Sequence, residues 1–582
     1  MHWRLSTQSC RWPYDTWQCC SGSPWASLSR LVLREARWMT FVITQSCCED
    51  AACVTVCPVQ CIRPRPGDPD FESTEQLYID PSSCIDCGAC ATACPVDAIY
   101  PGDALPPSLS TFSAVNAEYF EARPLTPAEP PVISRNRLTL GQSTLMVAVI
   151  GSGPAALYAA TELTEIPGVE VTIIERLPTP FGLIRSGVAP DHDNTKRIAD
   201  RLGRVLVRPN VRCLFDVEVG RDISIAEVLQ HHHAVIVATG AASARRPGVP
   251  GEALAGSVSA KEFVSWYNGH PDSALPDFSI KGPRAVVIGN GNVALDVARL
   301  LAQRATAYAS TSVSDSALRS LTAGSIEEVA VVGRRSQAFA AYSTAELTAL
   351  THLPDVDLVA EASEIAVTDD DWAAASQSGR GWALARRYDI VAEAAARTCT
   401  RPRRIILRYG LTPVALLGQH EVTGIELTRH DGTKEVIETS LVIWAVGFTG
   451  QPIDGLPFDG DRGVLPNREG RVIDLRGGRP VPGVYCTGWA KRGASGVIGT
   501  NRVDAAETVA SLMEDLKNGR LADPRGGPES FADLARLRRP RLLEVDGWRR
   551  IDDAEVDAGR DQGRTRVKFV TWSGLRDAGH ND

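Results

Sequence analysis

The stretch Val147-Ala148-Val149-Ile150-Gly151-Ser152-Gly153-Pro154-Ala155-Ala156 decides the fold of most of this chain. Its apolar residues are typical of a short buried strand, its glycines of a turn, and residues 155–163 of the helix that follows. Gly151 permits the tight turn, Gly153 lets the backbone approach a pyrophosphate, and Ala156 allows close helix packing. The free N–H groups at such a helix N-terminus favour an anion. The stretch therefore predicts a dinucleotide-binding unit.

The strand ends that follow two such units indicate which dinucleotide each unit binds. The strand after the first unit ends in Glu175, where a carboxylate bonds ribose hydroxyls. A second unit turns at residues 289–293, and its next strand ends in Arg334 and Arg335. A guanidinium grips phosphate in a bidentate fork, whereas a carboxylate would repel a 2′-phosphate. We therefore expect FAD in the first unit and NADP(H) in the second; the alternative for the two arginines is a solvated strand end.

Nine of the fifteen cysteines lie between residues 47 and 94. The second half of this segment has the bacterial-type ferredoxin run Cys84-x2-Cys87-x2-Cys90-x3-Cys94-Pro95, in which the fourth cysteine ligates the other cluster. The first half repeats the run imperfectly as Cys47-x5-Cys53-x3-Cys57-Pro58. The pattern predicts two iron–sulfur sites: site I with Cys47, Cys53 and Cys94, and site II with Cys57, Cys84, Cys87 and Cys90.

Site I lacks one thiolate, because its expected second cysteine falls at Asp50. A carboxylate is a harder and weaker ligand for iron than a thiolate. Asp50 therefore predicts a [3Fe–4S] cluster, or one that interconverts with [4Fe–4S] as iron becomes available, while site II is expected to hold a [4Fe–4S] cluster. Two alternatives remain open: Cys48 could replace Cys47 as a ligand, and zinc could replace the clusters.

The length and charge of the chain limit which class of protein it can belong to. A chain of 582 residues is too long for one core, and its composition is that of an ordinary globular protein. It has no run of 18 apolar residues, so we expect no membrane span and a cytoplasmic location. Residues 39–118 carry eleven acidic residues against two arginines. An acidic module on a nearly neutral body argues against nucleic-acid binding and for docking to a basic surface.

These patterns predict an α+β bacterial-type ferredoxin fold followed by two α/β dinucleotide-binding, Rossmann-like domains, with the NADP domain inserted into the FAD domain. The expected segments are a disordered or over-extended N-terminus at 1–38, the two-cluster ferredoxin domain at 39–118, a Pro-rich linker at 119–144, the first part of the FAD domain at 145–243, the NADP domain at 244–441, and the second part of the FAD domain with a C-terminal tail at 442–582. For residues 1–38 the alternative is an organellar transit peptide. The tail shows no site signal.

Residues 145–582 resemble the adrenodoxin-reductase-type ferredoxin–NADP reductases. The motifs that carry the resemblance are residues 149–154, 178–192, 289–293, 333–335 and 488–501. Together with the two-cluster segment, the chain resembles the fused ferredoxin/ferredoxin–NADP reductases of actinobacteria. The resemblance implies hydride transfer between NADP(H) and FAD, then one-electron transfer between the flavin and the clusters. An outside ferredoxin or another one-electron acceptor protein is the expected further partner, and we expect a monomer.

The resemblance also implies roles for individual residues. FAD would be held by Gly153, Ala155, Glu175, Leu183, Val219, Trp489, Gly496, Val497 and Ile498. NADP(H) would be held by Asn290, Gly291, Asn292, Val293, Arg334, Arg335, Glu346 and Gly496, with Arg245 near the cofactors. His192 matches a family histidine near the flavin and the nicotinamide, and its alternative is a core histidine fixed by its loop.

The chain departs from the family pattern at several positions. The acid that often follows three residues after Glu346 is Ala349 here, so any proton relay through it is missing or rerouted. Ala155 stands where serine is frequent, and Ala494 where proline is frequent. The gap between Cys47 and Cys53 is shorter than in most seven-iron ferredoxins, which leaves the cluster type of site I open.

Two other functions compete with a reductase. A subunit of a glutamate-synthase-type oxidoreductase also joins clustered cysteines to two dinucleotide units, but residues 178–192 favour the reductase group. A redox- or iron-sensing module could use the Asp50 site alone, but it would leave both dinucleotide units without a role. The reductase is therefore the prediction.

The predicted preference for NADPH depends on Arg334 and Arg335. Each charge-assisted bond to a phosphate contributes about 1.5–3 kcal/mol. We expect the double variant Arg334→Ala/Arg335→Ala to lower kcat/KM for NADPH by about 100-fold or more, since about 1.4 kcal/mol is tenfold, and to leave NADH nearly unaffected. Steady-state kinetics with both nucleotides measure this. A preference for NADPH that survives the double change would contradict the assignment of the second unit.

Overall fold

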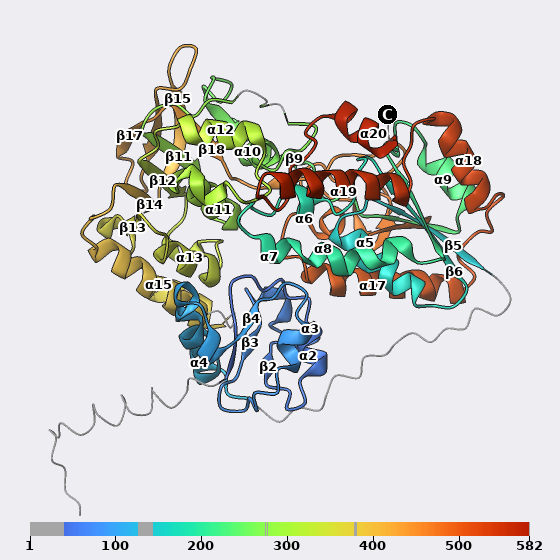
Figure 1. Cartoon of the computed structure of the whole chain (residues 1–582), viewed down its shortest axis with the longest axis horizontal. Coiled ribbons are helices and arrows are strands. Elements are labelled where there is room, and N and C mark those ends of the chain that lie inside the picture. The colour runs from blue at the N-terminus through green and yellow to red at the C-terminus, as the bar shows by residue number, and fades with distance from the viewer. Residues whose placement is uncertain (1–39, 126–143, 274, 276–277, 378–380, 581–582) are drawn as a thin grey trace, which may run out of the picture.

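The computed structural model describes residues 40–125, 144–273, 275, 278–377 and 381–580, which form three packed domains (Figure 1). We call them the cysteine-rich domain (40–125), the seven-stranded domain (144–244 and 448–580) and the six-stranded domain (245–447). The predicted N-terminal segment 1–38 and most of the predicted linker lie outside the described residues. Among the helices that the structure describes, none is long and apolar enough to span a bilayer.

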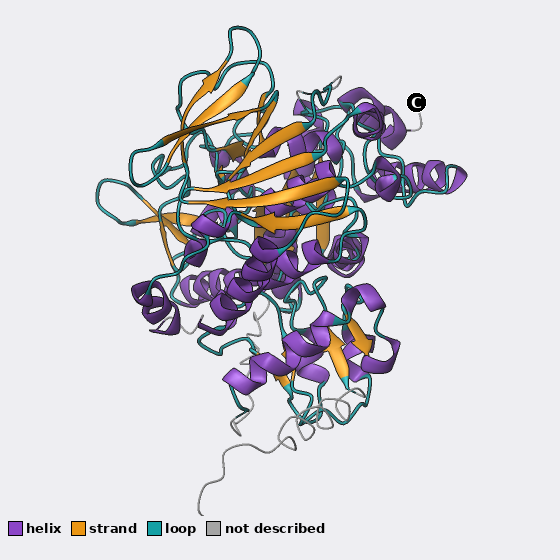
Figure 2. Ribbon diagram, turned by 90° about the vertical axis from the view of Figure 1, so that its left-hand side faces the viewer, coloured by secondary structure: helices purple, strands orange, loops and turns teal. Residues whose placement is uncertain are grey.

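The seven-stranded domain is built on a mainly parallel sheet. Figure 2 is seen from the side of the six-stranded domain, so the seven-stranded domain lies at the back of that view. Its strands, in spatial order, are β20 (Asn467–Arg468), β21 (Arg471–Ile473), β22 (Pro480–Cys486), β8 (Ala234–Val237), β5 (Leu145–Ile150), β6 (Val169–Glu175) and β7 (Val211–Phe215). Side chains alternate between faces along β5. Val147 and Val149 pack with α5 (Pro154–Thr164) and α17 (Thr500–Lys517), while Ala148 and Ile150 pack on the opposite face.

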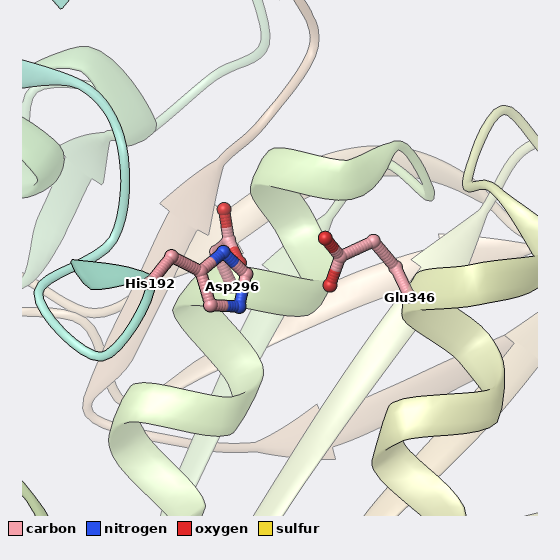
Figure 3. Close-up of side chains that lie close together, drawn as sticks. All are labelled: His192, Asp296 and Glu346. Carbon is pink, nitrogen blue, oxygen red and sulfur yellow. The ribbon is translucent and has the colours of Figure 1, made fainter. Parts of the chain in front are cut away.

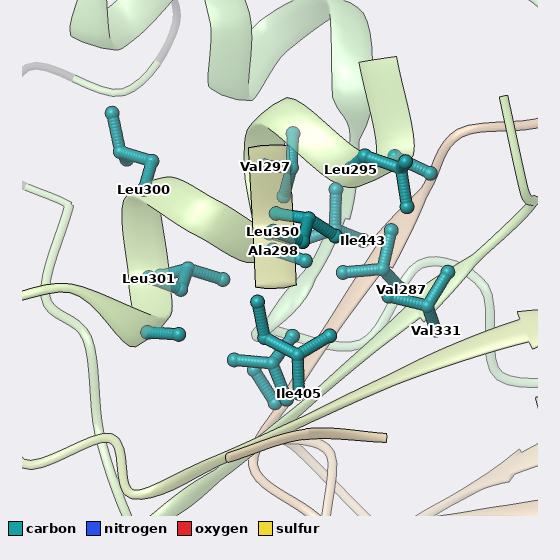
Figure 4. Close-up of a cluster of buried hydrophobic side chains, with 14 of the residues drawn as sticks. Val287, Leu295, Val297, Ala298, Leu300, Leu301, Val331, Leu350, Ile405 and Ile443 are labelled. Carbon is teal, nitrogen blue, oxygen red and sulfur yellow. The ribbon is translucent and has the colours of Figure 1, made fainter. Parts of the chain in front are cut away.

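The six-stranded domain has an entirely parallel sheet inserted between β8 and β22 of the first sheet. Its strands, in order, are β10 (Ser257–Ser259), β18 (Leu441–Trp444), β11 (Arg284–Ile288), β12 (Glu328–Gly333), β14 (Arg403–Tyr409) and β13 (Val356–Ala360). Figure 4 shows Val287, Val331, Ile405 and Ile443, each from a different strand, packed beneath α11 (Asn292–Ala302). A three-stranded antiparallel sheet covers the domain: β15 (Thr412–Leu417), β16 (Gly424–Thr428) and β17 (Lys434–Glu438).

The chain passes between the two sheets through one short antiparallel pair, β9 (Ser243–Ala244) with β19 (Phe448–Thr449). The predicted boundary at 441/442 is therefore wrong, because it falls inside β18, which pairs with β10 and β11 of the six-stranded sheet. Buried parallel strands all read as continuous apolar runs, so the sequence of β18 does not reveal which sheet it joins. The return to the seven-stranded domain comes after Gly447.

The cysteine-rich domain repeats one small motif twice, as its sequence predicts. Each half contributes to a two-stranded antiparallel pair, β1 (Phe41–Ile43) with β4 (Ile99–Pro101) and β2 (Ile62–Arg63) with β3 (Tyr78–Ile79), and supplies one short helix, α2 (Ala52–Val56) or α3 (Ala89–Ala93). Helix α4 (Thr111–Ala122) locks onto both pairs, because the buried Asn116 amide accepts from Ile43 N and Ile79 N and donates to Ile43 O. The predicted domain end at 118 thus falls inside α4.

Outside the C-terminal tail, the other α-helices of the described residues complete the seven-stranded and six-stranded domains. They are α6 (Leu183–Ser186), α7 (Asp193–Lys196), α8 (Ile198–Leu202), α9 (Ile225–His231), α10 (Ala260–Tyr267), α12 (Asp315–Ala323), α13 (Thr344–Thr351), α14 (Asp369–Gln377), α15 (Gly381–Ala396) and α16 (Trp489–Arg492).

The C-terminal tail, which carries no site signal in the sequence, joins two domains. It forms α18 (Pro528–Arg538), α19 (Val545–Asp561) and α20 (Trp572–His580), which lie over the seven-stranded sheet in Figure 1. The carboxylate of the fully buried Glu555 accepts hydrogen bonds from both terminal nitrogens of Arg185, at 2.6 and 2.8 Å. Lys568 Nζ donates to Arg185 O and to Asn268 O of the six-stranded domain. The tail therefore connects both dinucleotide domains.

Candidate active site and cluster sites

The glycine turn of the first dinucleotide unit has the predicted geometry. Gly151 has φ +105°, and a Cβ there would lie 2.6 Å from Ala238 O, so only glycine fits. Helix α5 begins directly after Gly153, with Pro154 in its first turn and no side-chain cap. The uncapped N–H groups can therefore receive an anion.

The predicted ribose ligand Glu175 lies beside this turn. Its Oε2 accepts from Ser152 N and Oγ, at 2.9 and 2.7 Å, and its Oε1 accepts from Leu177 N at 2.9 Å. Burial raises the pKa of this carboxyl, and the bonds from Leu177 and Ser152 counteract that rise. Its Oε1 accepts one of these bonds and can still accept from a ribose hydroxyl.

The remaining residues predicted for FAD come from four separate segments. Leu183 is exposed at the start of α6, whereas Val219 is buried next to the sheet. Trp489 opens α16, donates from Nε1 to Ser495 O at 2.9 Å and stacks on Phe448. Residues 496–498 form the turn before α17. Arg245 is exposed beside β9 and donates from Nε to Phe448 O at 3.3 Å.

The second dinucleotide unit repeats the first in the six-stranded domain. Gly289 has φ +120°, and a Cβ there would lie 2.2 Å from Ala445 O. Within residues 290–293, Asn292 Oδ1 accepts from Ser343 N at 2.7 Å. Arg334 and Arg335 are exposed after β12, and the guanidinium of Arg335 lies over the Phe339 ring. Both charged groups can therefore reach a phosphate from solvent.

Three ionisable side chains from separate elements meet between these two units (Figure 3). His192 comes from the turn before α7, Asp296 from α11 and Glu346 from α13, and their ligand atoms lie within 4.8 Å of one another. His192 belongs to the seven-stranded domain and the two acids to the six-stranded domain. The structure thus brings the predicted His192 and Glu346 together and adds Asp296.

A buried arginine compensates the acids of this group. Arg299 donates to Asp191 from Nε at 2.8 Å, to Asp296 at 2.7 Å and to Glu346 at 3.4 Å. Burial opposes ionisation of Asp191, but attraction to Arg299 and His192 outweighs it and lowers the Asp191 pKa to about 2. Burial raises the pKa of Glu346. Arg299 therefore supplies a positive charge directly beside both acids of the three-residue group.

The four cysteines predicted for site II lie together in the structure. Cys57, Cys84, Cys87 and Cys90 line one cavity together with apolar side chains such as Phe41, Ile62 and Ile79. Cys61 also lines it, with its sulfur 3.5 Å from that of Cys57. Four convergent thiols in an apolar cavity fit a [4Fe–4S] cluster.

Site I has three thiols and a carboxylate that interacts with other protein side chains. Cys47, Cys53 and Cys94 pack in one buried cluster. Cys47 and Cys94 also touch the core of the seven-stranded domain, but Cys48 packs in that core alone and is absent from the cluster of the cysteine-rich domain, which favours Cys47 as the ligand. The carboxylate of Asp50 forms an ion pair with Arg201 and accepts from Tyr158 Oη at 2.8 Å. Three thiols without a free fourth ligand fit a three-iron cluster.

The acidic face of the cysteine-rich domain docks on arginines of the other two domains, as its charge predicts. The pairs are Asp50–Arg201, Asp97–Arg197, Glu75–Arg387 (3.2 Å) and Glu118–Arg386 (3.7 Å). Two of these arginines belong to α8 and the residue just before it, and two to α15. The basic surface predicted for a partner is thus within the same chain.

Two glycine turns, a charged group between them and two cysteine sites define a class of protein: a pyridine-nucleotide and flavin oxidoreductase fused to an iron–sulfur domain. The family described as "Pyridine nucleotide-disulphide oxidoreductase" matches residues 145–371, and the family described as "4Fe-4S binding domain" matches residues 77–100.

Individual proteins that match the chain over most of their length identify its family more specifically than the two family models do. The chain is 43% identical over 540 residues to "Probable ferredoxin/ferredoxin--NADP reductase" of Mycobacterium leprae, covering 91% of this chain and 96% of that protein. It is 36% identical to "NADPH:adrenodoxin oxidoreductase, mitochondrial" of Arabidopsis thaliana, covering 77% and 98%. A solved structure of Mycobacterium tuberculosis FprA in complex with NADPH has 37% identity and a TM-score of 0.71, covering 75% of this chain and 100% of that chain. The chain belongs to the ferredoxin/ferredoxin–NADP reductase family.

The charge balance around Arg299 predicts a stability change. In Arg299→Leu, three carboxylates would lose their buried cation, which should lower the free energy of unfolding by about 3–5 kcal/mol. Urea unfolding at pH 7 measures this. The control is Arg304→Leu, whose exposed ion pair with Asp355 should contribute at most about 1 kcal/mol.

The same variant should show a distinct pH dependence. Because the pKa of Asp191 is lowered in the folded protein, its ionised carboxylate stabilises the fold at pH values above 3.8, the ordinary pKa of this group. This stabilisation is lost as the pH falls towards about 2. The stability difference between the wild type and Arg299→Leu should therefore narrow below about pH 4. A constant difference would show that Asp191 is not the partner that matters.

Proposed function

We propose that this protein is an NADPH-dependent ferredoxin reductase that passes electrons to its own iron–sulfur domain and from there to an outside one-electron acceptor protein. When bound, NADPH would supply a hydride to FAD, and the flavin would supply the two electrons one at a time to the clusters. The observation that carries this proposal is the position of His192 and Glu346. They lie between the two dinucleotide turns, where a nicotinamide and a flavin would meet.

The residues of the chain bind and orient the cofactors. The turn at 289–293 and the exposed Arg334 and Arg335 would hold NADP(H), with the arginines on its 2′-phosphate. The turn at Gly151 and Gly153, Glu175, and residues 496–498 would hold FAD. Hydride transfer needs close, aligned carriers more than a protein acid or base. Positioning is therefore the main contribution that we assign to this site.

The cofactor assignment adds one [4Fe–4S] cluster on Cys57, Cys84, Cys87 and Cys90 and one [3Fe–4S] cluster on Cys47, Cys53 and Cys94. Three thiolates hold a three-iron cluster, and thiolate is the ligand that iron–sulfur clusters prefer. Burial raises the pKa of the Cys47 thiol to about 12 and that of Cys90 to about 11. Each of these thiols must lose its proton to bind iron as a thiolate.

Anaerobic mixing with NADPH tests the function. We expect loss of the oxidised flavin absorbance first and loss of cluster absorbance second, in the full-length protein without added ferredoxin. Chemical analysis should give about seven irons per flavin, and EPR of the oxidised protein should show a [3Fe–4S] signal. A flavin that NADPH reduces while the clusters stay oxidised would contradict electron transfer to the iron–sulfur domain.

The variant His192→Ala tests the role of the histidine. Because hydride transfer does not require a protein acid, we expect a decrease of about tenfold or less in the rate constant for flavin reduction, with FAD still bound. Stopped-flow absorbance measures this rate. A loss of several orders of magnitude with FAD retained would make His192 essential and overturn the positioning role.

A further inference from the structure

The carboxylate of Asp50, in the loop of site I, is already engaged by protein partners and is not free to bind a metal. Its side chain is 1% exposed, although it carries a carboxylate. Arg201 of α8 pairs with one oxygen, and the Tyr158 hydroxyl on α5 donates to the other at 2.8 Å. Both partners belong to the seven-stranded domain. A buried carboxylate with a cation and a hydroxyl donor is electrostatically satisfied without a metal.

The backbone around Asp50 is held by the same domain. Arg502 Nη1 donates to Asp50 O at 2.8 Å, and Gly499 N donates to Cys48 O at 2.8 Å. A Cβ at Gly499 would lie 2.1 Å from Glu49 O, so these two backbone segments approach to a distance that only glycine allows. Gly499 directly precedes α17, in the segment that follows the proposed flavin residues 496–498.

Site II lies in different surroundings. Cys87 is exposed, and the neighbouring Ile85 is 58% exposed. Val59, which also lines the site II cavity, is 38% exposed. Of the two sites, site I is therefore the one in contact with the proposed flavin segment, while site II has its rim in solvent.

We propose that Asp50 is a positioning residue and not an iron ligand. Arg201 and Tyr158 hold its carboxylate away from the cluster and fix the site I loop against the start of α17. Site I thereby stays a three-thiolate site and is the first acceptor of electrons from the flavin, with site II second. This inference rests on the proposed function, because it uses the assignment of a three-iron cluster to site I.

Four variants of the full-length holoprotein test the proposal. Arg201→Gln removes the cation and frees the carboxylate, and Arg201→Lys keeps the charge and should rescue. Asp50→Asn/Arg201→Gln removes both charges, so that no unpaired buried charge remains. The control is Asp97→Asn, which breaks an exposed ion pair between the same two domains, with side chains 57% and 56% exposed.

Iron uptake is the readout that a merely structural role would not change. The protein is reduced, incubated with excess Fe(II), desalted and reoxidised, and the [3Fe–4S] EPR signal is quantified per flavin. A reduced three-iron cluster gains one Fe²⁺ with no further electron. We expect the wild type, Arg201→Lys and Asp97→Asn to retain the signal, and Arg201→Gln to lose at least half of it. The double variant should retain it, because it has no carboxylate to offer.

Amide hydrogen exchange of residues 46–52 reports the docking directly. We expect exchange at least fivefold faster in Arg201→Gln and in the double variant than in the wild type, and no such change in Asp97→Asn. In stopped-flow experiments on Arg201→Gln and on the double variant, the rate of flavin reduction by NADPH should equal that of the wild type, while the rate of cluster reduction should fall about tenfold. If Arg201→Gln does not fold, the double variant decides the proposal through its exchange and its cluster-reduction rate.

Three results would overturn the proposal. Loss of the three-iron signal in the wild type after Fe(II) treatment would show that Asp50 is free to bind iron. Unchanged exchange in the double variant would show that the ion pair does not hold the loop. Eight irons per flavin with no three-iron signal in untreated protein would remove the cluster assignment, but the proposed reductase would still stand if NADPH reduces the clusters.

Discussion

The buried guanidinium of Arg299 fixes how the two dinucleotide domains face each other. A charge this deeply buried must be compensated, and its three carboxylates come from both domains: Asp191 from one, Asp296 and Glu346 from the other. An altered angle between the domains would separate Arg299 from Asp191. Since His192 is the next residue along the chain, its place between the two glycine turns follows from the same constraint. The C-terminal tail supports it through Lys568, which donates to both domains.

The two halves of the cysteine-rich domain lie in different surroundings. Its two halves repeat in sequence and in secondary structure, yet Asp50 replaces a cysteine in only one of them. The Asp50 side chain is buried against the seven-stranded domain. The second half contacts the same domain through Asp97 but keeps Cys87 in solvent. Glu75 additionally accepts from Thr344 N at the start of α13, the helix that carries Glu346. The iron–sulfur domain is thus in contact with the elements of both proposed cofactor sites.

Local patterns in the sequence predicted the features that local chemistry determines. The need for glycine at 151 and 289, the arginines after β12 and the gathering of the four site II cysteines all follow from local spacing in the sequence. The boundary inside β18 was wrong, because a buried parallel strand carries no mark of its sheet. Arg299 and Tyr158 were missed for another reason. On a helix, each looks like an ordinary amphipathic residue, and its partner in another domain lies more than 100 positions away in the chain. The role of the tail was missed for the same reason.

The four ion pairs that dock the cysteine-rich domain have a consequence for competition between carriers. Arg197, Arg201, Arg386 and Arg387 are all engaged by acids of the same chain. The tethered domain is present at a high effective concentration that does not change when the protein is diluted. A free acidic carrier would have to displace it before reaching these arginines. Covalent fusion thus keeps one electron carrier bound to the enzyme and makes these four arginines less accessible to acidic carriers in solution.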